Sequence, residues 1–208
     1  MIEVIGISKS YAGKKILDDI NMRFEDGMIY CLMGESGIGK TTLLRLIMKL
    51  EKPDSGSIKG NSDIAAMFQE DRLIMDRTPV DNVLFVTKGH GKYSDREHIV
   101  KAMSEILPKV CLDKPVSQLS GGMKRRAALA RAMLSDRGTV ILDEPFTGLD
   151  NMARRDAIQF ILEYQNGRTI ILVTHDKNDA DMLNAGICLL TMKSAVDTMV
   201  RGFDISEV

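Results

Sequence analysis

A glycine-rich segment near the start of the chain has the residue types and spacing of a phosphate-binding loop. Gly34-Glu-Ser-Gly-Ile-Gly39-Lys40-Thr41 matches the pattern G-x-x-x-x-G-K-[ST]. Glycines let such a loop wrap a phosphate with its backbone N–H groups pointing inward, and the helix that follows adds its positive dipole end. The lysine then reaches the terminal phosphates and the threonine hydroxyl binds Mg²⁺. The pattern predicts phosphate contacts from Gly34, Glu35, Ser36, Gly37, Ile38, Gly39, Lys40, Thr41 and Thr42.

A second segment, Val140-Ile-Leu-Asp143-Glu144-Pro145, is apolar and ends in two carboxylates. It predicts a buried strand, and ligands of parallel sheets collect at the carboxyl ends of the strands. Asp143 is placed to hold Mg²⁺ through water, and Glu144 to orient or deprotonate an attacking water. Without the phosphate loop, the pair would also fit two solvated acids in a turn.

Apolar runs and amphipathic segments alternate along the rest of the chain. We predict strands at 2–7, 16–24, 28–33, 63–68, 139–142, 169–173 and 187–190, a turn at 53–56, and helices at 40–50, 94–107, 120–134, 152–164 and 176–184. The helix at 94 opens with the capping-box pattern Ser94-Asp-Arg-Glu97. Strands that alternate with helices indicate a parallel sheet covered on both faces.

The length of 208 residues suits a single domain. We expect one domain over residues 1–208, with a core at about 1–75 and 138–208 and a helical subdomain at about 76–137. Because only residues 191–208 follow the last predicted strand, we expect no added C-terminal regulatory domain.

Composition excludes several classes of function. A formal net charge of -1 argues against nucleic acid as a partner. No apolar run approaches the roughly 20 residues of a membrane-spanning helix, and the start, MIEVIGISKS, lacks the regions of a signal peptide. We therefore expect a cytoplasmic protein whose membrane role, if it has one, depends on a partner.

Several further motifs follow one another in the order found in one family. Leu119-Ser-Gly-Gly-Met123 resembles the L-S-G-G-Q signature of ABC (ATP-binding cassette) proteins. Gly148-Leu-Asp150 resembles their D-loop, and Val173-Thr-His-Asp176 their switch-histidine segment. Phe68-Gln69 is similar to the Q-loop, and Tyr11 stands where an aromatic residue usually stacks on adenine. The resemblance covers residues 1 to about 190 and identifies the chain as a member of this family.

The resemblance implies a fold and a set of site residues. The fold class is α/β: a P-loop NTPase (RecA-like) core with a parallel sheet, a small N-terminal antiparallel β part and an inserted α-helical subdomain. The cofactors are ATP and Mg²⁺. The chain pairs head-to-tail with a second ATP-binding subunit, which implies a homodimer, so its signature faces its partner's nucleotide. The implied roles are catalysis by Lys40, Gln69, Glu144 and His175, metal binding by Thr41, Gln69 and Asp143, and nucleotide binding by Tyr11, Ser120, Gly121, Gly122 and Asp150, besides the phosphate loop.

Some of these residues also have simpler explanations. Tyr11 could pack on its own sheet instead of stacking on adenine, His175 could cap a helix, and Ser120 could be an ordinary N-cap after a glycine turn. The basic run Lys124-Arg125-Arg126, with Arg131 beyond it, predicts a solvated helix face, with a dimer or phosphate contact as the alternative.

The segment 70–75 mixes charge with Leu73, Ile74 and Met75, which predicts an exposed apolar surface that binds a partner. In the family this region docks a helix of a transmembrane permease subunit at the cytoplasmic face of the membrane. The segments FQEDRL and LSGGMKRRAALARA resemble importer cassettes for nitrate, sulfonates and taurine, which also work with a solute-binding protein. The alternative is a cell-division cassette, which LIMDRTPVDNV resembles and which signals without transport. Met123 departs from the family because it replaces the usual glutamine of the signature.

Overall fold

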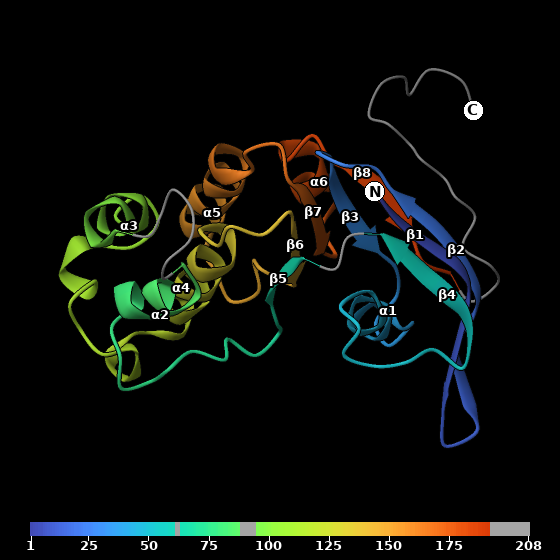
Figure 1. Ribbon diagram of the computed structural model, residues 1–208. Helices are drawn as coiled ribbons and strands as arrows, with labels where there is room; N and C mark the ends of the chain where they lie inside the picture. Colours follow the sequence, from blue (N-terminus) through green and yellow to red (C-terminus); the bar gives the residue numbers. More distant parts are fainter. Residues whose placement is uncertain (61–62, 88–94, 192–208) are drawn as a thin grey trace. The chain divides into compact units, whose positions relative to one another are not determined.

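The computed structural model describes residues 1–60, 63–87 and 95–191 (Figure 1). The strands are β1 (Ile2–Tyr11), β2 (Lys14–Phe24), β3 (Ile29–Met33), β4 (Ser55–Gly60), β5 (Ile64–Met67), β6 (Thr139–Asp143), β7 (Thr169–Val173) and β8 (Gly186–Leu189). The helices are α1 (Lys40–Ile47), α2 (Pro79–Thr87), α3 (Arg96–Met103), α4 (Gly121–Met133), α5 (Asn151–Tyr164) and α6 (Lys177–Met182), with short 3₁₀ helices at Lys109–Cys111 and Val116–Gln118.

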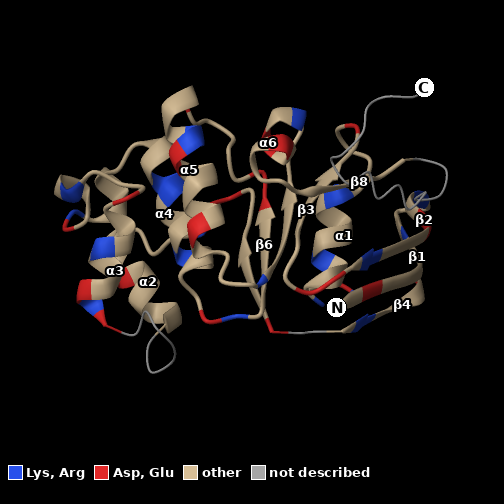
Figure 2. Ribbon diagram, turned by 90° about the horizontal axis from the view of Figure 1, so that it is seen from above, with Lys and Arg blue, Asp and Glu red and all other residues tan. Residues whose placement is uncertain are grey.

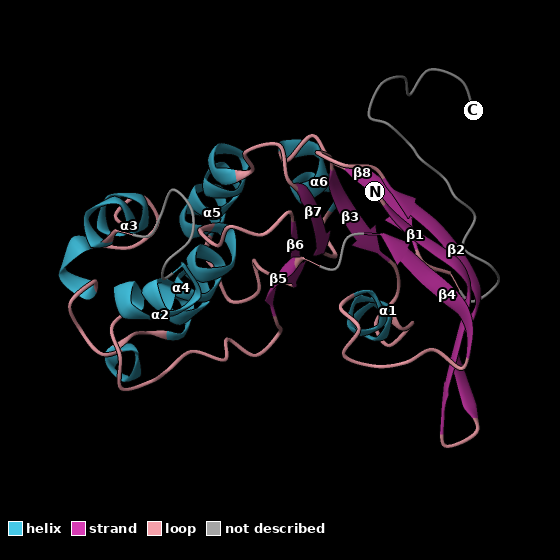
Figure 3. Ribbon diagram, viewed as in Figure 1, coloured by secondary structure: helices cyan, strands magenta, loops and turns pink. Residues whose placement is uncertain are grey.

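The chain divides into two compact units, which are described separately. The first comprises Met1–Ile64 and Gly167–Val208, and the second Ala65–Asn166. The predicted helical subdomain, about 76–137, lies within the second unit, and its exact boundaries stay a prediction. Figure 3 shows strands prevailing in the first unit and helices in the second.

The first unit contains an antiparallel and a parallel arrangement of strands. β1 lies between β2 and β4 and is antiparallel to both. β3 lies between β7 and β8 and is parallel to both, with Leu32 opposite Val173 and Cys188. Every residue of β3 and β7 is buried, as expected for parallel strands that are covered on both faces. The α/β fold with a parallel sheet and an N-terminal antiparallel part is therefore confirmed.

In the second unit, α4 occupies the centre and packs against α2, α5 and β6. Its buried face includes Ala127, Ala128, Leu129 and Met133. β6 is buried along its whole length and lies next to β5. The second unit thus positions the end of β6 against a helix that begins at the signature motif.

The predicted elements are confirmed with two omissions and one wrong cap. β4 and α2 are not predicted from the sequence as separate elements. The N-cap of α3 is Asp95, whose carboxylate accepts a hydrogen bond from the Glu97 N–H at 2.9 Å, so the capping-box prediction at Ser94 is wrong; Ser94 itself lies outside the described residues. The helix also ends at Met103 rather than near Leu107.

Within the described ranges, no helix is both long and apolar enough to cross a membrane.

Candidate nucleotide-binding site

The segment between β3 and α1 forms a loop that glycines make possible. Gly34, Gly37 and Gly39 have φ values of 151°, 77° and 110°. A Cβ on Gly34 would lie 2.6 Å from the carbonyl oxygen of Leu190, and one on Gly39 would lie 2.8 Å from Leu17 Cδ2. At Gly37, by contrast, no described heavy atom lies within 4 Å of the position a Cβ would take. The loop is therefore tight against the protein at both ends and open in its middle.

Lys40 places a positive charge inside this loop. Lys40 is 6% exposed, and its ammonium donates hydrogen bonds to the carbonyl oxygens of Gly34 and Glu35, both at 2.8 Å. No side chain in the described chain caps the N-terminus of α1, whose N-cap is Gly39. The first turn of a helix carries unpaired N–H groups and a partial positive charge. A loop with an enclosed ammonium next to such a helix end fits the phosphates of a nucleotide.

His175 follows the neighbouring strand on the same sheet edge. β3 and β7 are parallel, and Leu32 pairs with Val173. Gly34 and His175 each come two residues after this pair, so the phosphate loop and His175 leave the sheet at the carboxyl ends of adjacent strands. His175 is exposed. The structure therefore brings His175 and the phosphate loop to one edge, as predicted from the ends of parallel strands.

Tyr11 ends β1 and already has a polar partner in the first unit. Its hydroxyl donates a hydrogen bond to the carboxylate of Glu51, and this bond raises the pKa of Tyr11 above its ordinary value. The ammonium of Lys9 lies 5.5 Å from the centre of the Tyr11 ring. The residue is 41% exposed, so part of its surface is accessible to a ligand. Stacking on adenine stays a prediction.

The two predicted acidic residues end β6 in the second unit. Asp143 is 4% exposed, whereas Glu144 is half-buried. Glu144 has a φ of 53°, which is the left-handed region that L-residues adopt at a cost of about 1–2 kcal/mol. Its carboxylate accepts a hydrogen bond from the Thr147 hydroxyl at 3.2 Å, and its carbonyl accepts one from the Thr147 N–H at 3.2 Å. A tight turn thus presents the Glu144 carboxylate.

A buried arginine of α4 holds this turn and the segment after β5. Arg125 is 6% exposed, and its Nη1 donates to the carbonyls of Phe68 at 3.0 Å and Gln69 at 2.7 Å. Its Nη2 donates to the carbonyls of Asp143 at 2.7 Å and Glu144 at 2.5 Å. Hydrogen bonds to a charged group contribute about 1.5–3 kcal/mol each. The structure therefore brings Gln69, Asp143 and Glu144 together around one guanidinium.

The predicted solvated basic face on α4 is therefore wrong for Arg125. Figure 2 shows the basic residues of α4 in blue. Arg131 is also turned inward and donates to the carbonyls of Arg72 at 2.6 Å and Asp71 at 3.1 Å. Arg125 precedes Leu129 by four residues, so the two lie on one helix face. That spacing from the apolar residues of α4 is the signal that could have revealed the burial of Arg125.

The signature residues lie at the start of α4. Ser120 is the N-cap, and its hydroxyl accepts a hydrogen bond from the Met123 N–H at 3.3 Å. A Cβ on Gly122 would lie 3.6 Å from the carbonyl oxygen of Gly148, whereas no described heavy atom lies within 4 Å of such a position at Gly121. Asp150 caps α5 by accepting from the Ala153 N–H at 2.8 Å. The structure thus places the signature close to Gly148 in the same unit, with an open side at Gly121.

The loop after Gln69 is exposed only in part. Leu73 is half-buried and packs against the buried cluster Cys111–Val116–Leu119, so only part of its side chain is accessible; docking of a partner there stays a prediction. Ile74 and Met75 are 43% and 45% exposed. The buried Asn82 holds the backbone here, because its amide accepts from the Ile74 N–H at 2.8 Å and donates to the Ile74 carbonyl at 3.1 Å.

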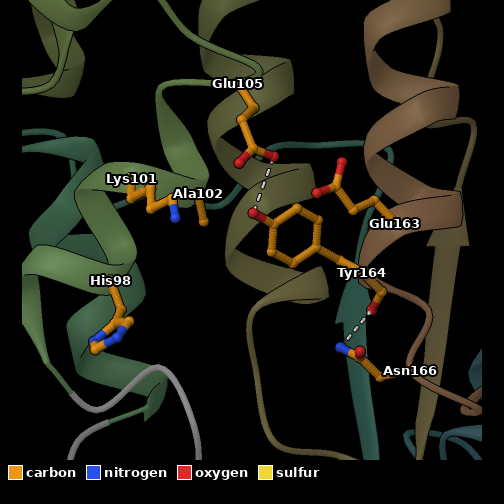
Figure 4. A pocket seen from close by; sticks show the side chains of 7 residues that line it. All are labelled: His98, Lys101, Ala102, Glu105, Glu163, Tyr164 and Asn166. Carbon is orange, nitrogen blue, oxygen red and sulfur yellow. Dashed lines mark hydrogen bonds between the residues drawn. The ribbon is translucent and has the colours of Figure 1, made fainter.

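A cavity of about 320 Å³ lies elsewhere in the second unit, between α3 and the end of α5 (Figure 4). The Tyr164 hydroxyl donates to the Glu105 carboxylate at 3.0 Å within it. Glu163, Lys101 and His98 also line it. Two carboxylates would repel a triphosphate, and none of the described lining residues belongs to the predicted nucleotide site.

Comparisons with known proteins show the family of the chain. A family model described as "ABC transporter" matches residues 17–147. The aliphatic sulfonates import ATP-binding protein SsuB 1 of Rhodococcus jostii (strain RHA1) is 38% identical over 200 residues, 91% of this chain and 79% of that protein. The methionine import ATP-binding protein MetN of Legionella pneumophila (strain Lens) is also 38% identical, over 85% of this chain, which spans 58% of MetN.

Among solved structures, the fold matches the dimeric post-hydrolysis state of the ATP-binding cassette MJ0796 bound to ADP and Pi. The TM-score is 0.84 at 25% sequence identity, covering 98% of this chain and 100% of that one.

Two glycine substitutions should separate the structural and ligand-binding demands on the loop. Gly34→Ala places a methyl group against the Leu190 carbonyl, at 2.6 Å, and should destabilise the fold by about 2–5 kcal/mol. Gly37→Ala meets no described atom within 4 Å and should cost about 1–2 kcal/mol from its positive φ alone. Its methyl group enters the open side of the loop, so ATP binding should weaken by about tenfold.

The measurements are urea unfolding of both variants and ATP titration of the Gly37→Ala protein. Equal loss of stability in the two variants would contradict the tight contact at Gly34. Unchanged ATP affinity of Gly37→Ala would contradict a phosphate in the open part of the loop.

Proposed function

Because this chain belongs to the ABC transporter family and is an ATPase of it, we propose that it binds ATP with Mg²⁺ between two head-to-tail copies and drives import of a small solute through membrane subunits. The observation that carries this proposal is the enclosed ammonium of Lys40 on the carbonyls of the glycine loop. The remaining residue roles follow from where each side chain lies in its own unit.

In the first unit, Lys40 and the first turn of α1 bind the phosphates. Lys40 can exchange two neutral carbonyl acceptors for the charged β- and γ-phosphate oxygens, which form stronger hydrogen bonds with an ammonium. Glu35, Ser36, Ile38 and Thr42 lie in the loop and the first turn of α1, where their backbone N–H groups can contact phosphate. Thr41 binds Mg²⁺, Tyr11 supports adenine, and His175 contacts the γ-phosphate from the end of β7.

In the second unit, Asp143 holds Mg²⁺ through water and Glu144 acts as the general base toward the attacking water. Gln69 is exposed at its side chain while its carbonyl is fixed, which suits a residue that senses Mg²⁺-bound water. Mg²⁺, when bound, neutralises charge that develops on the phosphate oxygens. Ser120, Gly121, Gly122 and Asp150 contact the nucleotide held by the second copy.

The solute is a small molecule handled by the membrane subunits and a solute-binding protein, and this chain works at the cytoplasmic face of the membrane. Relatives at the same 38% identity are named for aliphatic sulfonates and for methionine, so the cassette itself does not specify the solute. The importer role is favoured because both relatives are named as import proteins, whereas a cell-division role rests on the short segment LIMDRTPVDNV. A permease encoded beside the chain would distinguish the two.

Glu144→Gln should abolish turnover and keep nucleotide binding. The change removes the carboxylate but keeps the size of the side chain, so kcat should fall by about 100-fold or more. ATP affinity should change less than about twofold, because the phosphates are held by the loop. Lys40→Ala should instead weaken ATP binding itself. The measurements are phosphate release and ATP titration.

The matched control is Glu163→Gln, which makes the same change at an exposed carboxylate of α5 in the same unit. It should hydrolyse ATP at the parental rate. Parental turnover by Glu144→Gln would refute the assignment of Glu144 as general base.

ATP should drive self-association of the Glu144→Gln protein. The signature at the start of α4 gains a ligand only when the γ-phosphate of a second copy faces it, and ADP lacks that group. Sedimentation should show dimers with ATP and Mg²⁺ and monomers without nucleotide. Dimers in the absence of nucleotide, or monomers under every condition, would contradict a site shared by two copies.

A charge at Gly121 tests which surface pairs. The position is open, so Gly121→Glu should fold but repel the partner's γ-phosphate and prevent the ATP dimer. Gly121→Gln has the same size without the charge and should dimerise more strongly than Gly121→Glu. Equal dimerisation of the two variants would move the paired surface away from the signature.

Ile74→Ser combined with Met75→Ser should weaken assembly with the permease. Full burial of such side chains contributes about 1.5–3 kcal/mol each, and since about half of each is already covered, about 1 kcal/mol each remains to be gained. The loss of about 2 kcal/mol corresponds to roughly 30-fold weaker binding. The measurement is co-purification with the co-expressed permease, together with the ATPase rate of the free subunit.

Val110→Ser is the control, because Val110 is 68% exposed in the same unit and lies outside the loop. Leu73 is unsuitable as a test, since it packs against the buried cluster and its substitution would also disturb that packing. Normal co-purification of the double variant would place the docking surface elsewhere.

A further inference from the structure

We infer that Arg125 is a positioning residue for ATP hydrolysis, which fixes the backbone of Gln69 and Glu144 relative to each other and to the start of the signature helix. The inference rests on the proposed roles of Gln69 and Glu144. Arg125 itself touches neither nucleotide nor metal in this assignment. It acts through the carbonyl groups that its guanidinium holds.

The planar guanidinium joins two segments that are distant in sequence. Nη1 binds the carbonyls that follow β5, those of Phe68 and Gln69. Nη2 binds the carbonyls that end β6, those of Asp143 and Glu144. The two nitrogens of a guanidinium have a fixed separation and direction. Arg125 therefore sets the spacing between the two segments, and a flexible or single-point donor would not.

The conformation of Glu144 depends on this contact. Its φ of 53° is unfavourable for a residue with a side chain. Such a conformation persists when the surrounding structure determines it, and here the Glu144 carbonyl lies 2.5 Å from Nη2 and 3.2 Å from the Thr147 N–H. Without the guanidinium, one of these two restraints is lost. The backbone can then relax and carry the carboxylate away from its position.

The charge of Arg125 is compensated by a nearby carboxylate, so the guanidinium can be accommodated in the interior. The carboxylate of Asp71 lies 3.0 Å from Nη1, with side-chain exposures of 7% for Arg125 and 27% for Asp71. Nε has no hydrogen-bond partner among the described residues. A buried donor without a partner is unfavourable. The hydrogen bonds of the same guanidinium to four backbone carbonyls explain why an arginine is nevertheless found here.

Arg131 offers a matched control on the same helix. Its guanidinium also donates to two backbone carbonyls, those of Asp71 and Arg72, in the loop that Arg125 holds. Within the described chain, these bonds do not include Gln69 or Glu144. A general loss of loop anchoring would affect both variants alike, whereas loss of positioning would affect Arg125 alone.

The experiment compares Arg125→Gln, Arg125→Lys and Arg131→Gln in the full chain. ATP bound per chain and its Kd are measured first, and kcat is then expressed per bound nucleotide, so that an unfolded fraction does not count as lost activity. Hydrogen exchange is followed in the peptides around residues 67–72 and 143–147. Arg125→Gln should lower kcat by about 30-fold with Kd changed less than about twofold.

Arg125→Lys keeps the charge but replaces the two-nitrogen fork by one ammonium, so its kcat should lie between those of the parent and Arg125→Gln. Exchange should accelerate in both peptides for the Arg125 variants, and Arg131→Gln should keep kcat within about threefold. If Arg125→Gln does not fold, Arg125→Lys serves as the test: a lower kcat at an almost unchanged Kd supports the inference, and an unchanged kcat contradicts it.

Equal kcat in the Arg125 and Arg131 variants, or unchanged exchange at residues 143–147, would overturn the inference. Parental turnover by Glu144→Gln would instead overturn the proposed catalytic role, so the two failures are distinguishable.

Discussion

Backbone carbonyl groups at the ends of strands impose a constraint that both units meet in the same way. A chain that leaves a sheet carries carbonyls that must find a donor, because an unpaired buried polar group costs about 1–3 kcal/mol. In each unit a cation on a helix donates hydrogen bonds to such carbonyls. Lys40 of α1 serves the loop after β3, and Arg125 of α4 serves the segments after β5 and β6.

The two cations differ in what they can release. The ammonium of Lys40 has two neutral carbonyls as acceptors and a loop open at Gly37, so a phosphate can replace them. The guanidinium of Arg125 binds four carbonyls and the Asp71 carboxylate in the interior. The arrangement at Lys40 therefore suits a ligand site, whereas the arrangement at Arg125 suits a structural role.

The sequence predicts those parts of the fold that local patterns determine. β3, β6 and β7 appear as apolar runs because both of their faces are buried, and their limits were predicted within one residue. β4 was missed because its sequence SGSIKG has one apolar residue and is mostly exposed, so pairing with β1 rather than burial makes it a strand. The site motifs were likewise local. The spacing of Arg125 from Leu129 could have indicated that Arg125 is buried, but its carbonyl partners and the cluster that Leu73 packs against lie far along the chain, and no local pattern identifies them.

Contacts between residues distant in the sequence also explain why Met123 stands where the family usually has glutamine. This residue packs on the cluster Cys111–Val116–Leu119, with its sulfur 3.8 Å from the sulfur of Cys111. A thioether suits that apolar setting, whereas an amide placed there would require a hydrogen-bond partner. Leu73 packs on the same cluster. The loop after Gln69 and the start of the signature helix are therefore joined by two kinds of contact. One is apolar packing of Leu73 and Met123 on a shared cluster, and the other is the guanidinium of Arg125 on the Gln69 carbonyl.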